Sequence, residues 1–193
     1  MRSRSIVMVG ALLLTGSLAS CASGADGGGV AEPGGAPAQT SESAAPTDSA
    51  DAAALAQAQA WLDAAVLPPG AVRSEAPIDG FGSYTGWPCG PVEELEGFWT
   101  IPGATVADTA NWLRENPTAN LLSTAGGPVP DDGTIDSAMV GYIPERDSQE
   151  GIVYTVAKTG DGVAVRAEVA ALTESASCPT LPDGGTYGAP GQG

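Results

Sequence analysis

Histidine is missing from this 193-residue chain, and basic residues are few: seven Lys and Arg stand against 23 Asp and Glu, for a formal net charge of −16. Without an imidazole the chain cannot form a Ser-His-Asp triad, a Cys-His protease pair or a histidine-containing zinc site. Its single lysine leaves it without the clustered cations that displace counterions from nucleic-acid phosphates. No G-x-G-x-x-G follows a predicted first strand. We therefore predict no catalytic residue, no metal, no cofactor and no nucleic-acid partner.

The N-terminal apolar run is too short to span a membrane permanently. It covers residues 6–14, between the cations Arg2 and Arg4 and the tetrapeptide LASC at residues 18–21, whereas a spanning helix needs about 20 apolar residues. A positive region, a short apolar core, small residues and then a cysteine follow the order of an export signal. This order resembles the signal peptide and lipobox of bacterial lipoproteins.

In that family a diacylglycerol is attached to the thiol of the lipobox cysteine, and cleavage makes this residue the new N-terminus. The resemblance implies that residues 1–20 are a signal peptide and that Cys21 carries the lipid, on the extracytoplasmic face of the cell membrane. Two acyl chains anchor a protein stably, whereas one chain holds it only marginally. The alternative is an ordinary secretory signal with a cysteine near its cleavage site.

Cysteine is scarce, and its number is odd. Lipidation of Cys21 leaves Cys89 and Cys178 out of the three cysteines. Outside the cytoplasm these two can oxidise to a disulfide, which would close a loop of about 90 residues and stabilise the fold by roughly 4–5 kcal/mol in the chain-entropy model. The alternative is a pair of reduced, buried cysteines.

The distribution of residue types divides the chain into four parts. Residues 21–48 are rich in Gly, Ala, Ser, Pro and acids and contain no aromatic residue, so they cannot bury enough apolar surface to offset the entropy of ordering. We predict a disordered tether there, after the signal peptide. A globular domain follows over residues 49–182, and a flexible tail over residues 183–193.

The predicted domain combines helical and strand patterns. Apolar residues at helical spacing predict helices over about 49–66 and 105–115, each ended by a proline. Strands are predicted over residues 98–101, 120–124, 137–143, 151–158 and 162–172. This order of elements indicates an α+β fold: an antiparallel sheet of about four to five strands with two helices on one face.

Acidic residues gather in two places. Asp131, Asp132 and Asp136 have the composition of a polar turn, and the alternative is a calcium site of hard oxygen ligands. The second group is Glu93, Glu94 and Glu96. Two carboxylates from this group could carry out glycoside hydrolysis, which requires such a pair.

Aromatic residues are few, but half of them lie close to Cys89. They are Phe81, Tyr84, Trp87, Phe98 and Trp99. One interpretation is packing against the disulfide. The other is a stacking platform or shallow pocket for a sugar, a peptide or an apolar ligand, with Trp87, Tyr84, Phe81 and Trp99 as its ligand-binding residues.

The cations outside the signal peptide are isolated in an acidic chain. The arginines are Arg73, Arg114, Arg146 and Arg166. We interpret them as salt-bridge partners, with anion binding as the alternative.

These features favour a membrane-anchored, non-enzymatic binding or accessory module of the cell envelope. Its partners would be the plasma membrane, through the lipid on Cys21, and an envelope protein or small ligand of unknown identity. The alternatives are a carboxylate-dependent enzyme acting on envelope carbohydrate and a purely structural envelope component.

Overall fold

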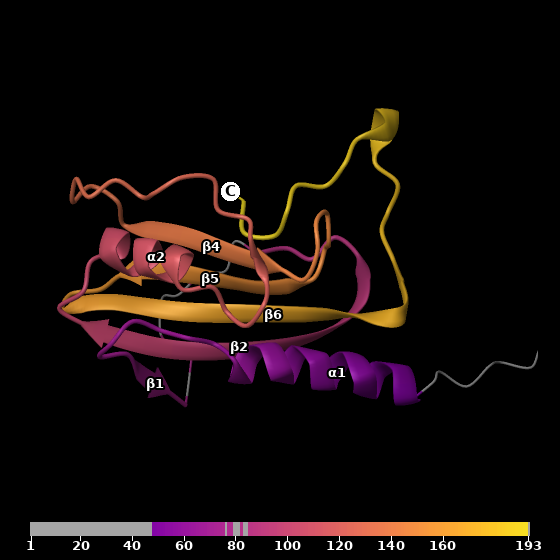
Figure 1. Cartoon of the computed structure of the whole chain (residues 1–193), viewed down its shortest axis with the longest axis horizontal. Coiled ribbons are helices and arrows are strands. Elements are labelled where there is room, and N and C mark those ends of the chain that lie inside the picture. The colour runs from indigo at the N-terminus through magenta and orange to yellow at the C-terminus, as the bar shows by residue number, and fades with distance from the viewer. Residues whose placement is uncertain (1–47, 76, 79–81, 83–84, 193) are drawn as a thin grey trace, which may run out of the picture. The chain divides into compact units, whose positions relative to one another are not determined.

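The computed structural model describes residues 48–75, 77–78, 82 and 85–192. Its helices and strands are α1 (Asp48–Asp63), β1 (Val72–Ser74), β2 (Gly90–Pro102), α2 (Val106–Glu115), β3 (Leu122–Ser123), β4 (Ser137–Ile143), β5 (Gly151–Lys158) and β6 (Gly162–Ser177). A single 3₁₀ turn, Pro182–Gly184, follows β6. The two longest strands, β2 and β6, lie side by side (Figure 1).

The strands form one open, antiparallel sheet with the order β1-β2-β6-β5-β4-β3 (Figure 1). The α+β class predicted from the sequence is confirmed, but the predicted count of four to five strands is wrong, because the sheet has six. The additional strand is β1, whose three residues pair with Phe98–Thr100 of β2. A strand this short shows no period-two pattern of its own, so the sequence does not reveal it.

One face of the sheet, which we call the helix face, packs against both helices. Its buried strand residues are Trp99 and Ile101 of β2, Val140 and Tyr142 of β4, Ile152, Tyr154 and Val156 of β5, and Val163, Val165, Ala167, Val169 and Ala171 of β6. They form one cluster with Ala58 and Leu62 of α1 and with Ala110 and Leu113 of α2. Since successive strand residues point to opposite faces, this alternation places α1 and α2 on the same face.

The first turn of α2 follows from its N-cap residue. The Thr105 hydroxyl accepts a hydrogen bond from the backbone N–H of Asp108 at 3.0 Å, and this satisfies one of the free N–H groups at the helix start. Leu113, at the other end of α2, is fully buried. The helix is therefore capped at its start and held by apolar contact near its end.

Two buried tyrosines supply polar contacts within the helix face. The Tyr142 hydroxyl donates to the carbonyl oxygen of Leu113, and the hydroxyls of Tyr154 and Thr118 lie 2.6 Å apart. Burial raises the pKa of Tyr142 to about 12. It also raises the pKa of Tyr154, against the smaller opposing effect of the Thr118 hydrogen bond. Both phenols are therefore held neutral in the folded chain.

The opposite face, which we call the second face, is partly polar although it is also largely covered. Thr155 and Glu168 are buried there, at 2 % and 7 % exposure. The Arg166 guanidinium forms an ion pair with Glu96 and a second one, at 3.2 Å, with Glu168. It also lies 5.8 Å from the ring centroid of Phe98. The second face thus buries charge, which the helix face does not.

The C-terminal residues lie against the second face. The sequence predicts a flexible tail over residues 183–193, whereas in the structure Pro190 is buried. Its carbonyl oxygen accepts a hydrogen bond from the Thr124 hydroxyl at 2.9 Å. A Cβ added to Gly141 would lie 2.2 Å from the Pro190 oxygen, and one added to Gly191 would lie 2.8 Å from the Gly141 Cα. Two glycines therefore permit an approach of backbone to backbone that composition alone does not reveal.

Candidate functional site

A groove of about 600 Å³ lies on the second face. Its walls come from three separate segments: residues 85–88, strand β4 and the C-terminal segment, by which we mean residues 187–192. We call it the aromatic groove, and it is lined by Thr85, Gly86, Trp87, Pro88, Met139, Gln149, Tyr187, Gly188, Ala189, Pro190, Gly191 and Gln192. Trp87 and Tyr187 are half-buried, so part of each ring is open to a ligand.

A disulfide joins the segments that carry the two aromatic walls. Cys89 and Cys178 are bonded, with a Cα–Cα distance of 4.1 Å, and this confirms the bridge predicted from the sequence. Cys89 directly follows the Trp87-Pro88 wall, and Cys178 precedes the C-terminal segment. The covalent link therefore restricts how far the two walls can separate.

Hydrogen bonds hold the C-terminal segment at its place. The Tyr187 hydroxyl donates to the Pro179 carbonyl at 2.9 Å. The Gln192 side-chain amide donates to the Thr124 carbonyl at 2.6 Å. The Gln149 amide lies 3.4 Å from the Gly188 carbonyl and is itself buried. These contacts position one wall of the groove before any ligand arrives, which lowers the entropic cost of binding.

The structure separates the aromatic residues that the sequence analysis grouped together. Trp87 lines the aromatic groove, whereas Trp99 is buried on the helix face at 7 % exposure, with the Arg73 guanidinium 5.3 Å from its ring centroid. Phe98 lies on the second face beside Arg166. Phe81 and Tyr84 lie outside the described residues. Of the predicted ligand-binding residues, the structure places Trp87 in the groove.

Tyr187 and Met139, which line the groove together with Trp87, were not predicted from the sequence. Tyr187 lies in the segment DGGTYGAPGQG, whose glycines indicate a tail rather than a wall. Met139 reaches the groove because it alternates with Val140, which is buried in the core. The one available signal was an isolated aromatic residue in an otherwise Gly-rich segment after Cys178.

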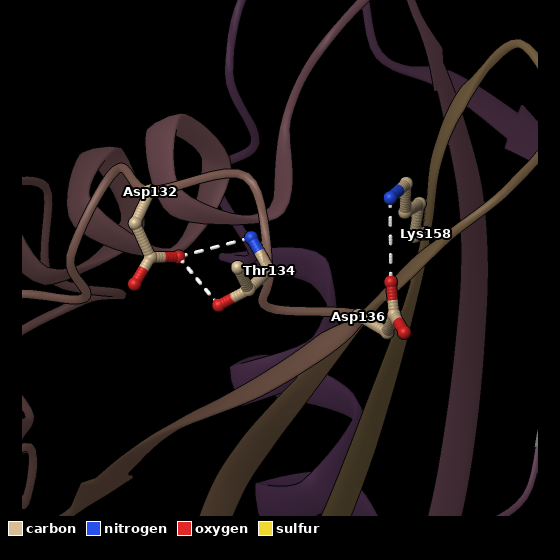
Figure 2. Close-up of polar contacts among 4 residues, drawn as sticks. All are labelled: Asp132, Thr134, Asp136 and Lys158. Atoms are coloured by element: carbon tan, nitrogen blue, oxygen red, sulfur yellow. Dashed lines mark hydrogen bonds and ion pairs between the residues drawn. The ribbon is translucent and has the colours of Figure 1, made fainter.

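The first acidic group is arranged as a turn. Asp132 accepts hydrogen bonds from the Thr134 backbone N–H at 2.9 Å and from its hydroxyl at 2.7 Å, and Lys158 Nζ lies 3.3 Å from the carboxylate of Asp136 (Figure 2). The backbone hydrogen bond, followed by that from the hydroxyl, lowers the pKa of Asp132. Within the described ranges no three His, Cys, Asp or Glu side chains are grouped to hold a metal ion.

The second acidic group lies on β2. Alternation along the strand puts Glu93 on one face and Glu94 with Glu96 on the other. Glu96 forms an ion pair with Arg166 of the neighbouring strand, β6. This carboxylate therefore already balances a cation of the fold.

The cations have different environments. Arg166 and Lys158 form the salt bridges predicted for basic residues, and Arg73 stacks on Trp99. Arg114 and Arg146 line separate cavities, each beside Thr124 and Gln192. Two of the four arginines thus face open space near the C-terminal segment.

The lipidation site predicted at Cys21 lies outside the described residues. In the part of the chain that the structure describes, no helix has the length and apolar character needed to cross a membrane. No family model, no curated protein and no solved structure matches this chain.

Proposed function

We propose that the chain is a lipid-anchored, extracytoplasmic lipoprotein whose folded domain is a non-enzymatic binding module of the cell envelope. The observation that carries the binding role is the aromatic groove, with Trp87 and Tyr187 on walls from segments 100 positions apart in the chain. Its volume of about 600 Å³ falls in the range of about 300–1,000 Å³ typical of small-molecule sites.

A saccharide is the ligand class that fits this lining best. The apolar C–H faces of sugar rings stack on aromatic side chains, and half-buried Trp87 and Tyr187 offer such surfaces. Sugar hydroxyls need both donors and acceptors. The exposed Gln192 amide offers its oxygen and its second N–H within the same lining, while the other N–H donates to Thr124. Among the described residues, those that line the aromatic groove carry no charge, so an ionic ligand forms no ion pair with them.

The envelope location rests on two independent features. The lipobox-like order of residues ending at Cys21 supports lipidation, and the Cys89–Cys178 disulfide supports an oxidising compartment. The pairing of Glu96 with Arg166 supports a non-enzymatic role, because this carboxylate is engaged in the fold.

The groove is tested by calorimetric titration of the full chain with triacetylchitotriose as the probe. Trp87→Ala should weaken binding by about 10- to 30-fold, since an aromatic anchor at the centre of a site contributes about 2 kcal/mol. Trp87→Phe should retain most of the affinity. Val72→Ala serves as the control because Val72 is exposed on β1, away from the groove. Equal binding by all variants, or no binding by the unaltered chain, contradicts the saccharide site.

The anchor is tested separately. Cys21→Ala should leave an uncleaved precursor or release the protein from the membrane fraction, because no thiol remains for the lipid. Cys89→Ala should leave the protein membrane-bound. If the Cys21→Ala chain is processed normally and stays in the membrane, lipid attachment at this residue is refuted.

A further inference from the structure

A second, smaller cavity adjoins the aromatic groove and differs from it in charge. Its volume is about 310 Å³, and it shares Met139, Gly191 and Gln192 with the groove. Arg114, from the last turn of α2, lines it, and no Asp or Glu does. By contrast, the cavities lined by Lys158 and by Arg146 also contain aspartates. In a chain of net charge −16, a cavity with a cation and no carboxylate is distinctive.

The Arg114 side chain forms no hydrogen bond and no salt bridge in the described part of the chain. Its Nε is buried and donates no hydrogen bond. Arg166 also has a buried Nε without a hydrogen-bond partner, but its guanidinium forms ion pairs with carboxylates, as does the ammonium group of Lys158. A buried donor that is left unpaired costs free energy unless a ligand or another group satisfies it.

The position of Arg114 in the helix explains its charge only in part. A cation in the last turn of a helix interacts favourably with the helix dipole. That interaction requires no cavity and no buried Nε. Gly126 and Gly127, which also line the cavity, are exposed and carry no side chain that would cover their backbone. The lining therefore offers a guanidinium beside exposed backbone.

We propose that this cavity, the Arg114 cavity, binds the carboxylate of a ligand whose remaining part occupies the aromatic groove. The carboxylate subsite stands on Arg114 itself, and the assignment of the rest of the ligand as a saccharide rests on the proposed function. A guanidinium matches a carboxylate with two parallel hydrogen bonds. A singly charged carboxylate is favoured over phosphate, because the net negative charge of the chain repels a doubly charged anion more strongly and Arg114 supplies a single positive charge. The ligand class is thus an acidic saccharide.

The subsite is tested first without any sugar. The full chain is titrated with sodium acetate while the ¹⁵N signal of the Arg114 Nε–H group, assigned by its loss in Arg114→Gln, is followed by NMR. Acetate should shift this signal in a saturable way and leave the Arg146 signal in place. No saturable shift overturns the proposal, whether or not the aromatic groove binds saccharides. A larger response to inorganic phosphate than to acetate overturns the assignment to a carboxylate.

The second test joins the two cavities. Glucuronic acid and glucuronamide have the same sugar ring and differ at one group, which is a carboxylate in the acid and a neutral amide in glucuronamide. The acid should bind the full chain about tenfold more tightly, as expected for one charge-assisted hydrogen-bonded pair. Arg114→Gln should abolish this preference, chiefly by weakening the binding of the acid. Arg114→Lys should restore part of it, because the charge returns without the planar fork.

Arg146→Gln is the matched control, since it removes the same charge from an exposed residue. If Arg114→Gln and Arg146→Gln reduce the preference equally, the effect comes from net charge and the subsite is refuted. If acetate shifts the Arg114 signal but neither sugar binds, the carboxylate subsite stands and the saccharide function fails.

Discussion

The two faces of the sheet are covered by different means. On the helix face, α1 and α2 bury a continuous set of apolar side chains, with Tyr142 and Tyr154 hydrogen-bonded inside it. On the second face, chain without helix or strand, at residues 85–89 and 187–192, packs over the strands. That face is held by a disulfide, an ion-pair cluster and side-chain hydrogen bonds to backbone.

This difference accounts for the positions of the aromatic groove and the Arg114 cavity. Regular helices fill the helix face with interdigitating side chains at the density of a protein interior. Irregular segments cannot match the pleated surface so closely, and the aromatic groove and the Arg114 cavity both adjoin the C-terminal segment. The two cavities proposed to bind a ligand thus lie beside irregular chain, where binding residues are common.

The largest expected effect comes from breaking the disulfide. The bridge joins residues 89 positions apart, so the double variant Cys89→Ser, Cys178→Ser should lose about 4–5 kcal/mol of unfolding free energy in the chain-entropy model. Guanidinium denaturation measures this loss. Native-state hydrogen exchange should accelerate over residues 187–192 while β5 and β6 remain protected. Unaltered chain treated with a thiol reductant should behave like the variant, and an unchanged denaturation midpoint would contradict the covalent contribution.

A smaller but still large effect is expected in the core of the helix face. Leu113 is fully buried on α2, so Leu113→Ala should cost about 3 kcal/mol through lost apolar contact and the cavity left behind. Leu122→Ala is the matched control because Leu122 is 51 % exposed on β3, and exposed substitutions usually change stability by less than about 0.5 kcal/mol. Equal destabilisation by the two variants in urea denaturation would contradict the assignment of the core.

The elements of the helix face are the ones that sequence reasoning predicts well. In β6, Val163, Val165 and Val169 alternate with residues of the other face, and this period identifies the strand. The start of β2 was missed, because Glu93, Glu94 and Glu96 make residues 90–97 look like an acidic loop. Those charges are tolerated because this part of β2 is an edge of the sheet. β1 pairs only with Phe98–Thr100 and leaves the start of β2 uncovered.

The candidate site is less predictable for a physical reason. Local composition identifies Trp87 beside a cysteine, but its neighbour Tyr187 is 100 positions away in the chain. The Cys89–Cys178 bridge and the close approach of Gly141 and Gly191 help to bring the two together. Neither contact has a periodic signature. The grouping of Trp99 with Trp87 has the opposite cause: the two are close in sequence, but Trp99 lies on the other face of the sheet.

The third effect concerns the charges of the second face. Arg166→Met should destabilise the fold by about 2 kcal/mol, less than the loss for a fully buried pair, because the side chain of Glu96 is 45 % exposed. The cost arises because buried Glu168 loses its cation. Adding Glu168→Gln to Arg166→Met should recover part of the loss in a double-mutant cycle. Additive effects of the two substitutions would show that the charges do not interact.

The smallest expected effect tests the polar contacts of the helix face and depends on pH. Tyr154→Phe should cost about 1 kcal/mol at pH 7, the usual worth of one hydrogen bond. Burial raises the pKa of Tyr154 and, to about 12, that of Tyr142. A phenol ionises near pH 10 in the unfolded chain. The stability that each neutral phenol contributes is thus complete below pH 10 and declines as the pH rises from 10 toward 12.

Removing the Tyr154 phenol should therefore make this alkaline decline less steep. Thr118→Val is the matched control, since it removes the same hydrogen bond and keeps the titrating group. It should reproduce the loss at pH 7 and retain the decline above pH 10. Urea midpoints measured for both variants at pH 7, 9, 10 and 11 distinguish the two contributions. A decline of equal steepness in Tyr154→Phe and the unaltered chain would mean that Tyr154 does not stay neutral in the folded core. The helix face would then be less tightly packed around this phenol than the structure indicates.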